Sequence, residues 1–456
     1  MRAAGVLADL GSALSEGALV VDPDVIEGYR YDRADTAPAG KPIAVVRAAS
    51  TADVQATMRV ASVHRVPVVV RGAGTGLSGG SSAIDGCITL STSLMRGISV
   101  EPEAMLAVVQ PGLLNAEVKA AAHAHGLWYP PDPSSFEICS IGGNLATNAG
   151  GLCCVKYGVT TDYVLALEVV LADGRAVRLG GRTIKDVAGY DLKRLFVGSE
   201  GTLGVVTEAT LRLRPQPPPA TTLVATFPSL VAAGVAVTKI MGTSRPSALE
   251  LMDQVSIRAV EAVTNMGLDT SSGALLLGRS DAGGAQSGVE VAAMALACEE
   301  AGADYVAVTE DPDEGEQLMA ARRMAIPAVE RLGTVMIEDV GVPIPRIPDL
   351  VVGVQEVATR NDTLIAVIGH AGDGNFHPLV TFDRRDAAAV ARAEAAFGEV
   401  MDVALALGGT ITGEHGVGTL KRGWLGAQVG EDVLDLTRRI KDALDPLGIL
   451  NPGKVI

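Results

Sequence analysis

Hydrophobic positions in the first half of the chain follow the short runs typical of strands and one longer helical period. Ile43–Arg47 and Pro67–Val70 are apolar, rich in β-branched residues, and predict strands. Thr51–His64 between them predicts a helix, with Ser50 placed to cap it and Asp53 in its first turn. Further strands are predicted at Cys87–Leu90, Met105–Val109, Ala166–Leu171 and Val205–Leu213, and a helix at Leu114–Ala124. This half therefore mixes strands and helices.

The pattern changes after the proline-rich stretch 214–219, which predicts a linker and a domain boundary. Beyond it the predicted order is β-α-β-β-α-β with extra helices, which approximates a ferredoxin-like unit. Its strands are Thr222–Phe227, Ala248–Met252, Ala274–Leu277 and Tyr305–Thr309, and its helices are Leu230–Met241, Ser256–Asn265 and Gly288–Ala301. Helices at Glu314–Leu332 and Ala387–Leu407 extend this part, and the tail is helical from Asp432 to Leu444.

Composition narrows the class of protein. A length of 456 residues suggests about three domains. The net charge of -16 argues against nucleic acid and anionic membrane surfaces as partners. The five cysteines form no C-x-x-C pair, so we expect neither an iron–sulfur cluster nor a zinc ribbon, but reduced thiols in the cytoplasm.

Membrane insertion is not expected. The early apolar stretch carries Asp9 and Glu16, which is atypical of a signal peptide, and no apolar run is long enough to span a bilayer. Peripheral attachment through a partner and a homodimer are both left open.

Two glycine-rich segments near the C-terminus, 369–377 and 408–418, contain half of the six histidines. Thr363–Ile368 and Leu379–Phe382 predict two strands, and Asp373-Gly374 between them is a strong signal for a two-residue hairpin turn. Such a turn places His370 directly opposite His377 on one face, where the pair can share a metal ion. The alternative is a hairpin whose histidines only pack or meet solvent.

Glu414 and His415 in the second segment suggest a third ligand and a base. Neighbours in a regular strand point to opposite faces, but Gly413 and Gly416 can relax that constraint. Our hypothesis is that Glu414 completes a His-His-Glu site while His415 points at substrate. This ligand set suits Zn, and Mn or Fe stays open.

Three other glycine-rich stretches lie in the first half. Segment 71–80 matches G-x-G-x-x-G, but a turn and a strand follow it, so it is not a Rossmann dinucleotide loop. It also lacks G-K-[ST], so it is not a P-loop. Its backbone N–H groups can still cradle phosphate, although a tight turn would look the same. In segment 140–151, Ser140 is predicted to cap a short helix that Gly150-Gly151 ends. With segment 198–207, these stretches predict an extended phosphate-bearing cofactor.

Together these segments resemble the FAD-linked oxidases of the vanillyl-alcohol oxidase type, and within them the group of glycolate oxidase, D-lactate dehydrogenase and D-2-hydroxyglutarate dehydrogenase. The resemblance spans about residues 40–456. Its motifs are RGAGTGLSGG, YPPDPSS, SIGGNLATNAGG, SEGTLGVVT, GHAGDGNFHP, GGTITGEHGVG and LNPGK. It implies an α+β fold with a two-part FAD-binding domain and a ferredoxin-like α+β substrate (cap) domain.

The expected division has four parts. Residues 1–40 form an N-terminal helical extension and 41–217 the FAD-binding domain. Residues 218–410 form the cap domain with the metal site. Residues 411–456 close the active site and return to the FAD domain.

The resemblance also implies roles for individual residues. His370, His377 and Glu414 would hold the metal, His415 would act as base, and Arg322 would bind the substrate carboxylate. The alternative for Arg322 is a solvated helix face. The implied FAD contacts are Gly72, Ala73, Gly74, Thr75, Gly76, Leu77, Pro131, Asp132, Ser140, Gly143, Thr147, Gly204, Val206 and Asn451.

Two departures refine the expected function. The phosphate loop has no histidine that could tether FAD, so we expect non-covalent FAD. Where 2-hydroxyglutarate enzymes place a polar residue and a lysine, this chain has Ile326 and Ile337. We therefore expect a dehydrogenase that oxidises a small D-2-hydroxy acid, of the D-lactate or glycolate type, to the 2-keto acid.

Several alternatives stay open at this point. They are a D-2-hydroxyglutarate dehydrogenase, an oxidase that uses O2, a metal hydrolase without flavin, and a silent FAD subunit that only relays electrons. The electron acceptor is equally open between a quinone, an electron-transfer flavoprotein and a separate iron–sulfur subunit.

Overall fold

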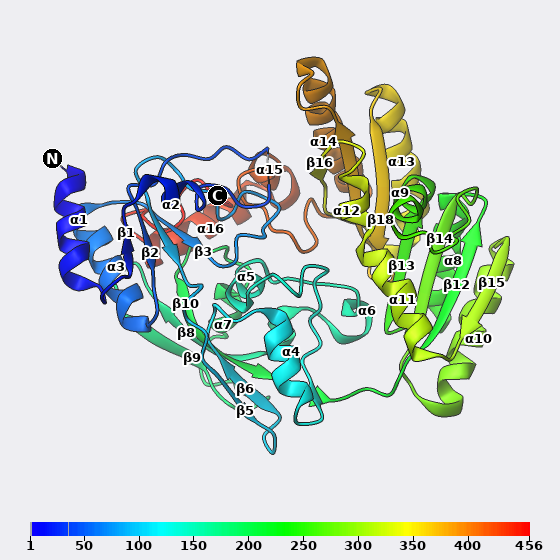
Figure 1. The fold of residues 1–456 in the computed structure, drawn as a ribbon, viewed down its shortest axis with the longest axis horizontal. Coiled ribbons are helices and arrows are strands. Elements are labelled where there is room, and N and C mark those ends of the chain that lie inside the picture. Colours follow the sequence, from blue (N-terminus) through cyan, green and yellow to red (C-terminus); the bar gives the residue numbers. More distant parts are fainter. Residues whose placement is uncertain (1, 35) are drawn as a thin grey trace. The chain divides into compact units, whose positions relative to one another are not determined.

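The computed structural model describes residues 2–34 and 36–456, so residues 1 and 35 of the predicted N-terminal extension lie outside it. The chain forms two compact units (Figure 1). Unit 1 contains the chain up to Gly150, then Val159–Gln216 and Glu414–Ile456, and unit 2 contains Gly151–Gly158 and Pro217–Gly413. The passage from unit 1 to unit 2 thus falls within the proline-rich stretch.

Unit 1 begins with a small sheet covered by helices. The elements are α1 (Arg2–Ala13), β1 (Leu19–Val20), α2 (Pro23–Glu27), β2 (Ala44–Arg47), α3 (Thr51–His64), β3 (Val68–Arg71) and β4 (Ile88–Ser91). The strand order is β1-β2-β4-β3, with β2 and β3 parallel to β4 and β1 antiparallel to β2. The predicted helix and strands are confirmed, and the Ser50 hydroxyl accepts a hydrogen bond from the Asp53 amide at 3.2 Å.

A second sheet of unit 1 is antiparallel throughout, in the order β5-β6-β10-β8-β9. Its strands are β5 (Ile98–Glu101), β6 (Leu106–Val109), β8 (Val164–Val170), β9 (Ala176–Gly180) and β10 (Val205–Arg212), and β7 (Leu127–Trp128) pairs with β11 (Arg214–Pro215). The helices of this part are α4 (Asn115–His123), α5 (Ile141–Thr147), a 3-10 turn at Thr160–Tyr163, and α7 (Lys193–Phe196).

The two ends of the chain both contribute to the core of unit 1. Val6 and Leu10 of α1 are fully buried in the same cluster as Met58 of α3. At the other end, α15 (Arg422–Val429) and α16 (Glu431–Leu444) precede a segment in which Leu450 forms a parallel bridge with Val68. The residues after 413 therefore complete the core of unit 1.

Unit 2 is built on one large antiparallel sheet in the order β15-β12-β14-β13-β18-β19-β16, with β17 also paired to β19. The strands are β12 (Thr221–Phe227), β13 (Ala248–Asp253), β14 (Ala274–Ser280), β15 (Tyr305–Thr309), β16 (Thr334–Ile337), β17 (Val340–Gly341), β18 (Leu364–His370) and β19 (Asn375–Phe382). The first four strands stand in the order 4-1-3-2, which is the ferredoxin-like arrangement predicted from the sequence.

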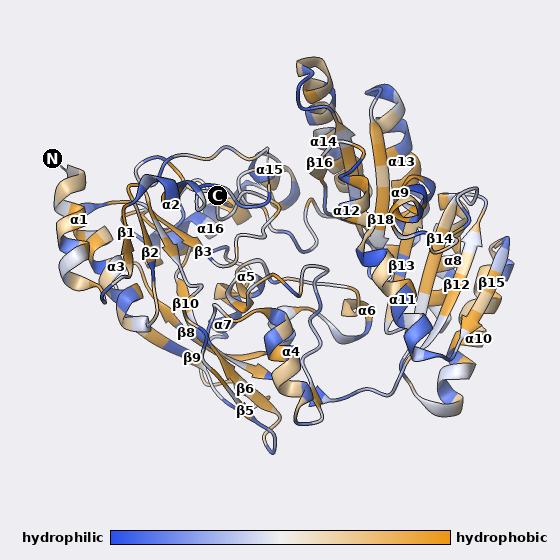
Figure 2. Ribbon diagram, viewed as in Figure 1, coloured by the Kyte–Doolittle hydropathy of each residue, from blue (hydrophilic) through white to orange (hydrophobic). Residues whose placement is uncertain are grey.

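Helices cover both faces of this sheet. α8 (Leu230–Thr243), α10 (Gly284–Glu300), α13 (Ile347–Arg360) and α14 (Ala387–Ala406) pack together on one face. α9 (Gln254–Thr264), α11 (Pro312–Arg323) and α12 (Ala325–Val329) pack on the other, and the short α6 (Cys154–Tyr157) contacts β13. Strands β13, β14 and β18 are largely hydrophobic, as expected for strands covered on both faces (Figure 2).

The prediction of a single helix over Glu314–Leu332 is wrong in one respect, because the chain forms two helices there, which meet at Met324. Pro327 explains the break. Its ring would clash with the carbonyl of residue 323, four positions earlier, and it has no N–H to donate to that carbonyl. α11 therefore ends at Arg323, and Pro327 falls in the first turn of α12, where proline is tolerated.

Candidate functional site

The hairpin that carries His370 and His377 has a different register from the predicted one. His370 pairs with Asn375 and Ile368 with His377, so a four-residue loop replaces the two-residue turn. A type I′ turn requires positive φ at both central residues, but only Gly374 has it, at +80°. The loop is held instead by Val342, whose amide donates to the Gly374 carbonyl at 3.0 Å.

The two histidines still meet, but as diagonal neighbours. Residues 370 and 377 lie two positions apart along the ladder and on the same face of the sheet. Their ring centroids are 5.2 Å apart with an interplanar angle of 83°, and both side chains are buried. The alternative in which these histidines meet solvent is therefore wrong.

This face of the sheet is the one covered by α9, α11 and α12. Met252, Ile368 and Leu379 on it pack with Ile257 and Val260 of α9 in one buried cluster. Because side chains alternate between faces, Glu250 and His370 share the side of Met252 and Ile368. The polar residues thus extend a hydrophobic face toward the ends of strands β13 and β18.

Arg322 of α11 reaches the same place. Its guanidinium Nη2 lies 3.0 Å from Glu250 Oε2, and the residue is only 2% exposed. The alternative of a solvated helix face is therefore wrong. On the other side of the same carboxylate, His370 Nδ1 lies 2.8 Å from Glu250 Oε1. Arg322, Glu250 and His370 form one buried row.

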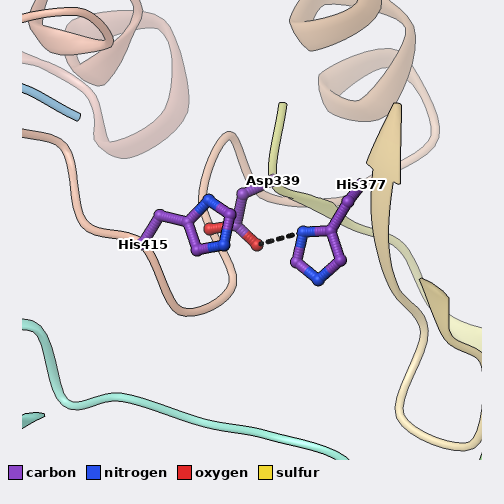
Figure 3. Close-up of side chains that lie close together, drawn as sticks. All are labelled: Asp339, His377 and His415. Carbon is purple, nitrogen blue, oxygen red and sulfur yellow. Dashed lines mark ion pairs between the residues drawn. The ribbon is translucent and has the colours of Figure 1, made fainter. Parts of the chain in front are cut away.

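Asp339, between β16 and β17, belongs to this region as well. Its Oδ1 lies 3.7 Å from His377 Nδ1, an ion-pair distance, and its side chain is fully buried (Figure 3). Its Oδ2 accepts hydrogen bonds from the Thr412 hydroxyl at 2.7 Å and the Gly413 amide at 2.8 Å. The peptide that continues into Glu414 and His415 therefore leaves unit 2 at this carboxylate.

Glu414 and His415 themselves belong to unit 1. Glu414 Oε1 and His415 Nε2 are 3.8 Å apart, so the two side chains do not point to opposite faces as they would in a regular strand. Gly416 has φ +88°, which allows this bend, as the sequence suggested. The joint action of His370, His377 and Glu414 on one metal stays a prediction.

The loop after His415 is fixed by Glu200. The Glu200 carboxylate accepts from the amides of Val417 at 2.7 Å and Gly418 at 2.9 Å. Burial raises the pKa of Glu200 to about 7, although these two hydrogen bonds and the nearby Lys454 act to lower the pKa. A buried carboxyl thus holds the loop that carries the predicted base.

The predicted phosphate loop lies against the start of α5. Ser140 Oγ accepts from the amides of both Ala73 and Gly143, at 3.1 and 3.3 Å. A Cβ on Gly72 would stand only 2.4 Å from that hydroxyl, so glycine is needed for this approach. Ser140 is the N-cap of α5, as predicted, but the helix ends at Asn148 in the left-handed conformation and not at Gly150-Gly151.

The tip of this loop has the character of an anion site. Within residues 2–34 and 36–456, the amides of Gly74, Thr75, Gly76 and Leu77 donate no hydrogen bond to protein. Successive N–H groups in this state form a concave donor row that suits phosphate oxygens. The loop therefore fits the pyrophosphate of the predicted cofactor.

The other predicted cofactor residues are distributed around the same unit. The side-chain amide of Asn115 donates to the Pro131 carbonyl and to Asn144 Oδ1. Because Asn144 lies in α5, this amide connects the segment Pro131-Asp132 to the helix that contains Thr147. Asn451 donates to the carbonyls of Gly80 and Glu200 at 3.1 and 2.6 Å. Gly204 packs tightly, since a Cβ there would lie 2.5 Å from Val169, and Val206 follows on β10.

Three buried carboxylates with evident structural importance were not identified from the sequence: Glu200, Glu250 and Asp339. Glu250 interrupts the apolar strand Ala248–Asp253, and Asp339 follows Glu338 beside two apolar strands. For Glu250, an acid between apolar strand residues was the available signal, because a buried carboxylate requires partners.

Family models match both parts of the chain. The model described as "FAD binding domain" matches residues 42–180, and "FAD linked oxidases, C-terminal domain" matches residues 216–455. Glycolate oxidase subunit GlcD of Bacillus subtilis (strain 168) is 42% identical over 94% of this chain and 91% of its own length. The D-lactate dehydrogenase of Archaeoglobus fulgidus is 36% identical over 94% of this chain and 96% of its own length.

Solved structures agree on the fold. The 4-ethylphenol oxidase of Gulosibacter chungangensis matches with a TM-score of 0.83 at 18% identity, covering 100% of this chain and 97% of that one. p-Cresol methylhydroxylase matches with a TM-score of 0.83 at 17% identity, covering 100% and 96%. These likenesses confirm the predicted α+β fold. By its family models and its relatives, the chain belongs to the FAD-linked oxidases of the vanillyl-alcohol oxidase type and is a FAD-linked oxidoreductase related to 2-hydroxyacid dehydrogenases.

Proposed function

We propose that the protein oxidises a small D-2-hydroxy acid of the D-lactate or glycolate type to the 2-keto acid. The observation that supports this most is the gathering of a guanidinium and two imidazoles at one end of a single sheet face, in Arg322, His370 and His377. The carboxylate of a 2-hydroxy acid could bind the guanidinium, and its hydroxyl could bind a cation held by the two imidazoles.

The donor set fits a divalent metal. His370 Nδ1 is hydrogen-bonded to Glu250, and a metal-binding histidine commonly has its other ring nitrogen hydrogen-bonded to a carboxylate in this way. With Glu414, the ligand set becomes His-His-Glu, which suits Zn. Mn and Fe also bind imidazole and carboxylate ligands and stay alternatives. When bound, the metal would lower the hydroxyl pKa of the substrate, and FAD would accept the hydride from its α-carbon.

The remaining steps fall to side chains. Arg322 would hold the substrate carboxylate, since a planar guanidinium presents its N–H donors in a fork that matches the two oxygens of a carboxylate. His415 would take the hydroxyl proton as general base. Both roles are testable by substitution.

The apolar positions Ile326 and Ile337 support a small substrate. Both lie partly buried at the border of the cluster that contains Met252 and Ile368. Neither offers a partner for a second substrate carboxylate, and burying an unpaired charge there would be costly. This favours D-lactate or glycolate over D-2-hydroxyglutarate.

Cofactor attachment, acceptor and location are proposed as follows. FAD is non-covalent, because segment 71–80 has no histidine. The acceptor is a quinone, an electron-transfer flavoprotein or a separate iron–sulfur subunit. None of the five cysteines forms a disulfide, which fits the cytoplasm, with contact to a membrane only through a partner. Among the described residues, no helix has the length and apolarity needed to cross a bilayer.

The cofactor proposals have direct assays. Acid precipitation and filtration should release all flavin, and flavin retained on the protein would contradict non-covalent binding. Metal analysis after gel filtration should find about one equivalent of Zn, Mn or Fe, and dialysis against a chelator should abolish turnover until the metal returns.

The central experiment is the anaerobic visible spectrum of the FAD-loaded protein with D-lactate, L-lactate, glycolate or D-2-hydroxyglutarate in separate cuvettes. Bleaching by D-lactate or glycolate is expected. Bleaching only by D-2-hydroxyglutarate would contradict the substrate class, and bleaching by none would contradict the dehydrogenase. Peroxide formed in air would identify an oxidase instead.

Substitutions then assign the roles. His415→Ala should abolish flavin reduction while FAD and metal stay bound. Arg322→Lys should lose much activity, because an ammonium cannot replace the planar fork. Arg323→Lys, one position further on the same helix, is its matched control. Equal effects of the two lysine variants would refute the clamp.

A further inference from the structure

Glu250 joins two groups that the proposed function uses separately. It lies on β13 directly opposite His370 on β18, and its carboxylate contacts His370 Nδ1 on one side and Arg322 Nη2 on the other. The side chains of all three are at most 4% exposed. They come from three elements of unit 2 that are far apart in sequence.

The carboxylate determines which ring nitrogen of His370 carries the proton. The Glu250 carboxylate faces the Arg322 guanidinium on its other side and offers oxygen acceptors to both partners, so we assign Nδ1, at 2.8 Å, as the donor. In the neutral imidazole, Nε2 then carries the lone pair. His370 is thereby held in the tautomer and orientation in which Nε2 can bind a metal.

The same carboxylate fixes Arg322. A long arginine side chain has many rotamers, and holding it in one of them costs conformational entropy unless a partner fixes it. Glu250 Oε2 at 3.0 Å supplies that partner and also balances the buried positive charge. The guanidinium is thus oriented before a substrate carboxylate arrives.

We propose that Glu250 is a positioning residue that couples the metal ligand His370 to the carboxylate clamp Arg322. The proposal rests on the proposed function of this site. A purely structural ion pair would affect only folding stability. A positioning residue also affects metal affinity and the affinity for the substrate carboxylate.

Glu250→Gln separates these two cases. The variant keeps size and shape, but a side-chain amide has one acceptor oxygen and one NH2 donor. If the oxygen faces Arg322, the NH2 faces Nδ1 and favours the opposite tautomer. If it faces His370, the NH2 meets the guanidinium, donor against donor.

Asp253→Asn is the matched control. Asp253 is a buried carboxylate at the end of the same strand, three residues later, where its side chain caps α9 by accepting from the Ser256 amide. The Asp253→Asn variant removes a carboxylate from the same strand and leaves Glu250, His370 and Arg322 unchanged.

The first measurement is Zn²⁺ affinity, by competition with a chromophoric chelator, on FAD-loaded, metal-stripped protein. We expect Glu250→Gln to weaken binding about 10–100-fold, the usual effect of removing the carboxylate that is hydrogen-bonded to a metal-binding histidine. Asp253→Asn should stay within about threefold of the wild type. An unchanged affinity in Glu250→Gln would overturn the proposal. Absence of Zn²⁺ binding to the wild type would instead overturn the proposed function.

The second measurement needs no substitution at Glu250 and stands even if that variant fails to fold. The chain has six histidines, so ¹⁵N labelling of histidine gives a small set of ring signals. His370→Asn identifies the signals of His370 by their loss. In the metal-stripped wild type, the His370 proton should be on Nδ1, and a proton on Nε2 would overturn the proposal.

Discussion

The buried carboxyl of Glu200 makes the stability of unit 1 depend on pH. Its pKa is raised from 4.5 to about 7, chiefly by burial. The charged groups that act on it are Lys454, which lowers the pKa, and Asp32, which raises it. When the pKa of a carboxyl is higher in the folded state than in the unfolded state, the folded protein is most stable at low pH, where the carboxyl is protonated in both states. The free energy of unfolding then falls as pH rises from the unfolded-state pKa to the folded-state pKa.

The size of the effect follows from the shift. A pKa change of one corresponds to about 1.4 kcal/mol, so a change from 4.5 to about 7 corresponds to about 3 kcal/mol. The contribution of Glu200 is fully present below pH 4.5, falls as pH rises to about 7, and is level above that. Asp32, whose pKa burial also raises, acts in the same direction.

Glu200→Gln isolates the contribution of this group, because glutamine does not titrate while Asp32 is present in both proteins. Urea unfolding of both proteins should be followed by tryptophan fluorescence at equal FAD concentration. Both tryptophans, Trp128 and Trp424, lie in unit 1, so the signal follows the unit that contains Glu200. The free energy of unfolding of the wild type, relative to the variant, should fall by about 3 kcal/mol between pH 4.5 and 7. A difference that stays constant within about 1 kcal/mol would refute the reasoning.

Three further substitutions, one of them with a matched control, test the packing of the two units. Gly79→Ala should destabilise unit 1 by more than Gly86→Ala, because both glycines have φ near +77° but only at Gly79 would a Cβ clash, 2.7 Å from Ala37 Cβ. The Gly86 variant should show only the left-handed backbone cost of about 1–2 kcal/mol, and equal urea midpoints would contradict this. Lys441→Met removes the cation that donates to Thr202, Leu450 and the buried Asp445, and should cost about 3–5 kcal/mol in the same assay. Phe227→Ala, at a fully buried position of β12, should lower the free energy of unfolding of unit 2 by about 3–5 kcal/mol, as measured by calorimetry. It should leave the unfolding detected by tryptophan fluorescence unchanged.

The elements that could be predicted from the sequence are those whose signal is local. Ser50 and Ser140 both cap helices as predicted, since a cap needs only a side chain and an amide three residues later. The ferredoxin-like order of unit 2 follows from alternating strand and helix patterns. The motifs that carry the family resemblance are also contiguous stretches of sequence.

The hairpin register could not be predicted because it depends on a distant segment. Asp373-Gly374 favours a two-residue turn locally, but Gly341 of β17 pairs with Asn375 and fixes where β19 begins. A Cβ on Gly374 would lie 2.2 Å from the Val342 carbonyl, so the loop is also shaped by close contact with that segment. Tertiary pairing therefore prevails over the turn signal.

The row of Arg322, Glu250 and His370 was beyond sequence reasoning for the same reason. Glu250 and His370 are 120 residues apart, and no local pattern pairs them. Arg322 is followed by a second arginine, so its neighbours suggest solvent exposure. The register of β13 against β18 places Glu250 opposite His370, and the packing of α11 brings Arg322 to the same carboxylate.

The large sheet explains how a hydrophobic core and a polar site lie side by side without weakening one another. Two adjacent rows cross β14, β13, β18 and β19 on the same face. One row is Leu275, Met252, Ile368 and His377, and the next is Leu277, Glu250, His370 and Asn375. On β13 and β18, the change from the apolar Met252 and Ile368 to the polar Glu250 and His370 thus takes one step of the two-residue strand period. Rigid paired strands hold the polar groups at fixed spacing, and the buried side chains of Met252 and Ile368 beside them exclude water, which strengthens the hydrogen bonds of Glu250.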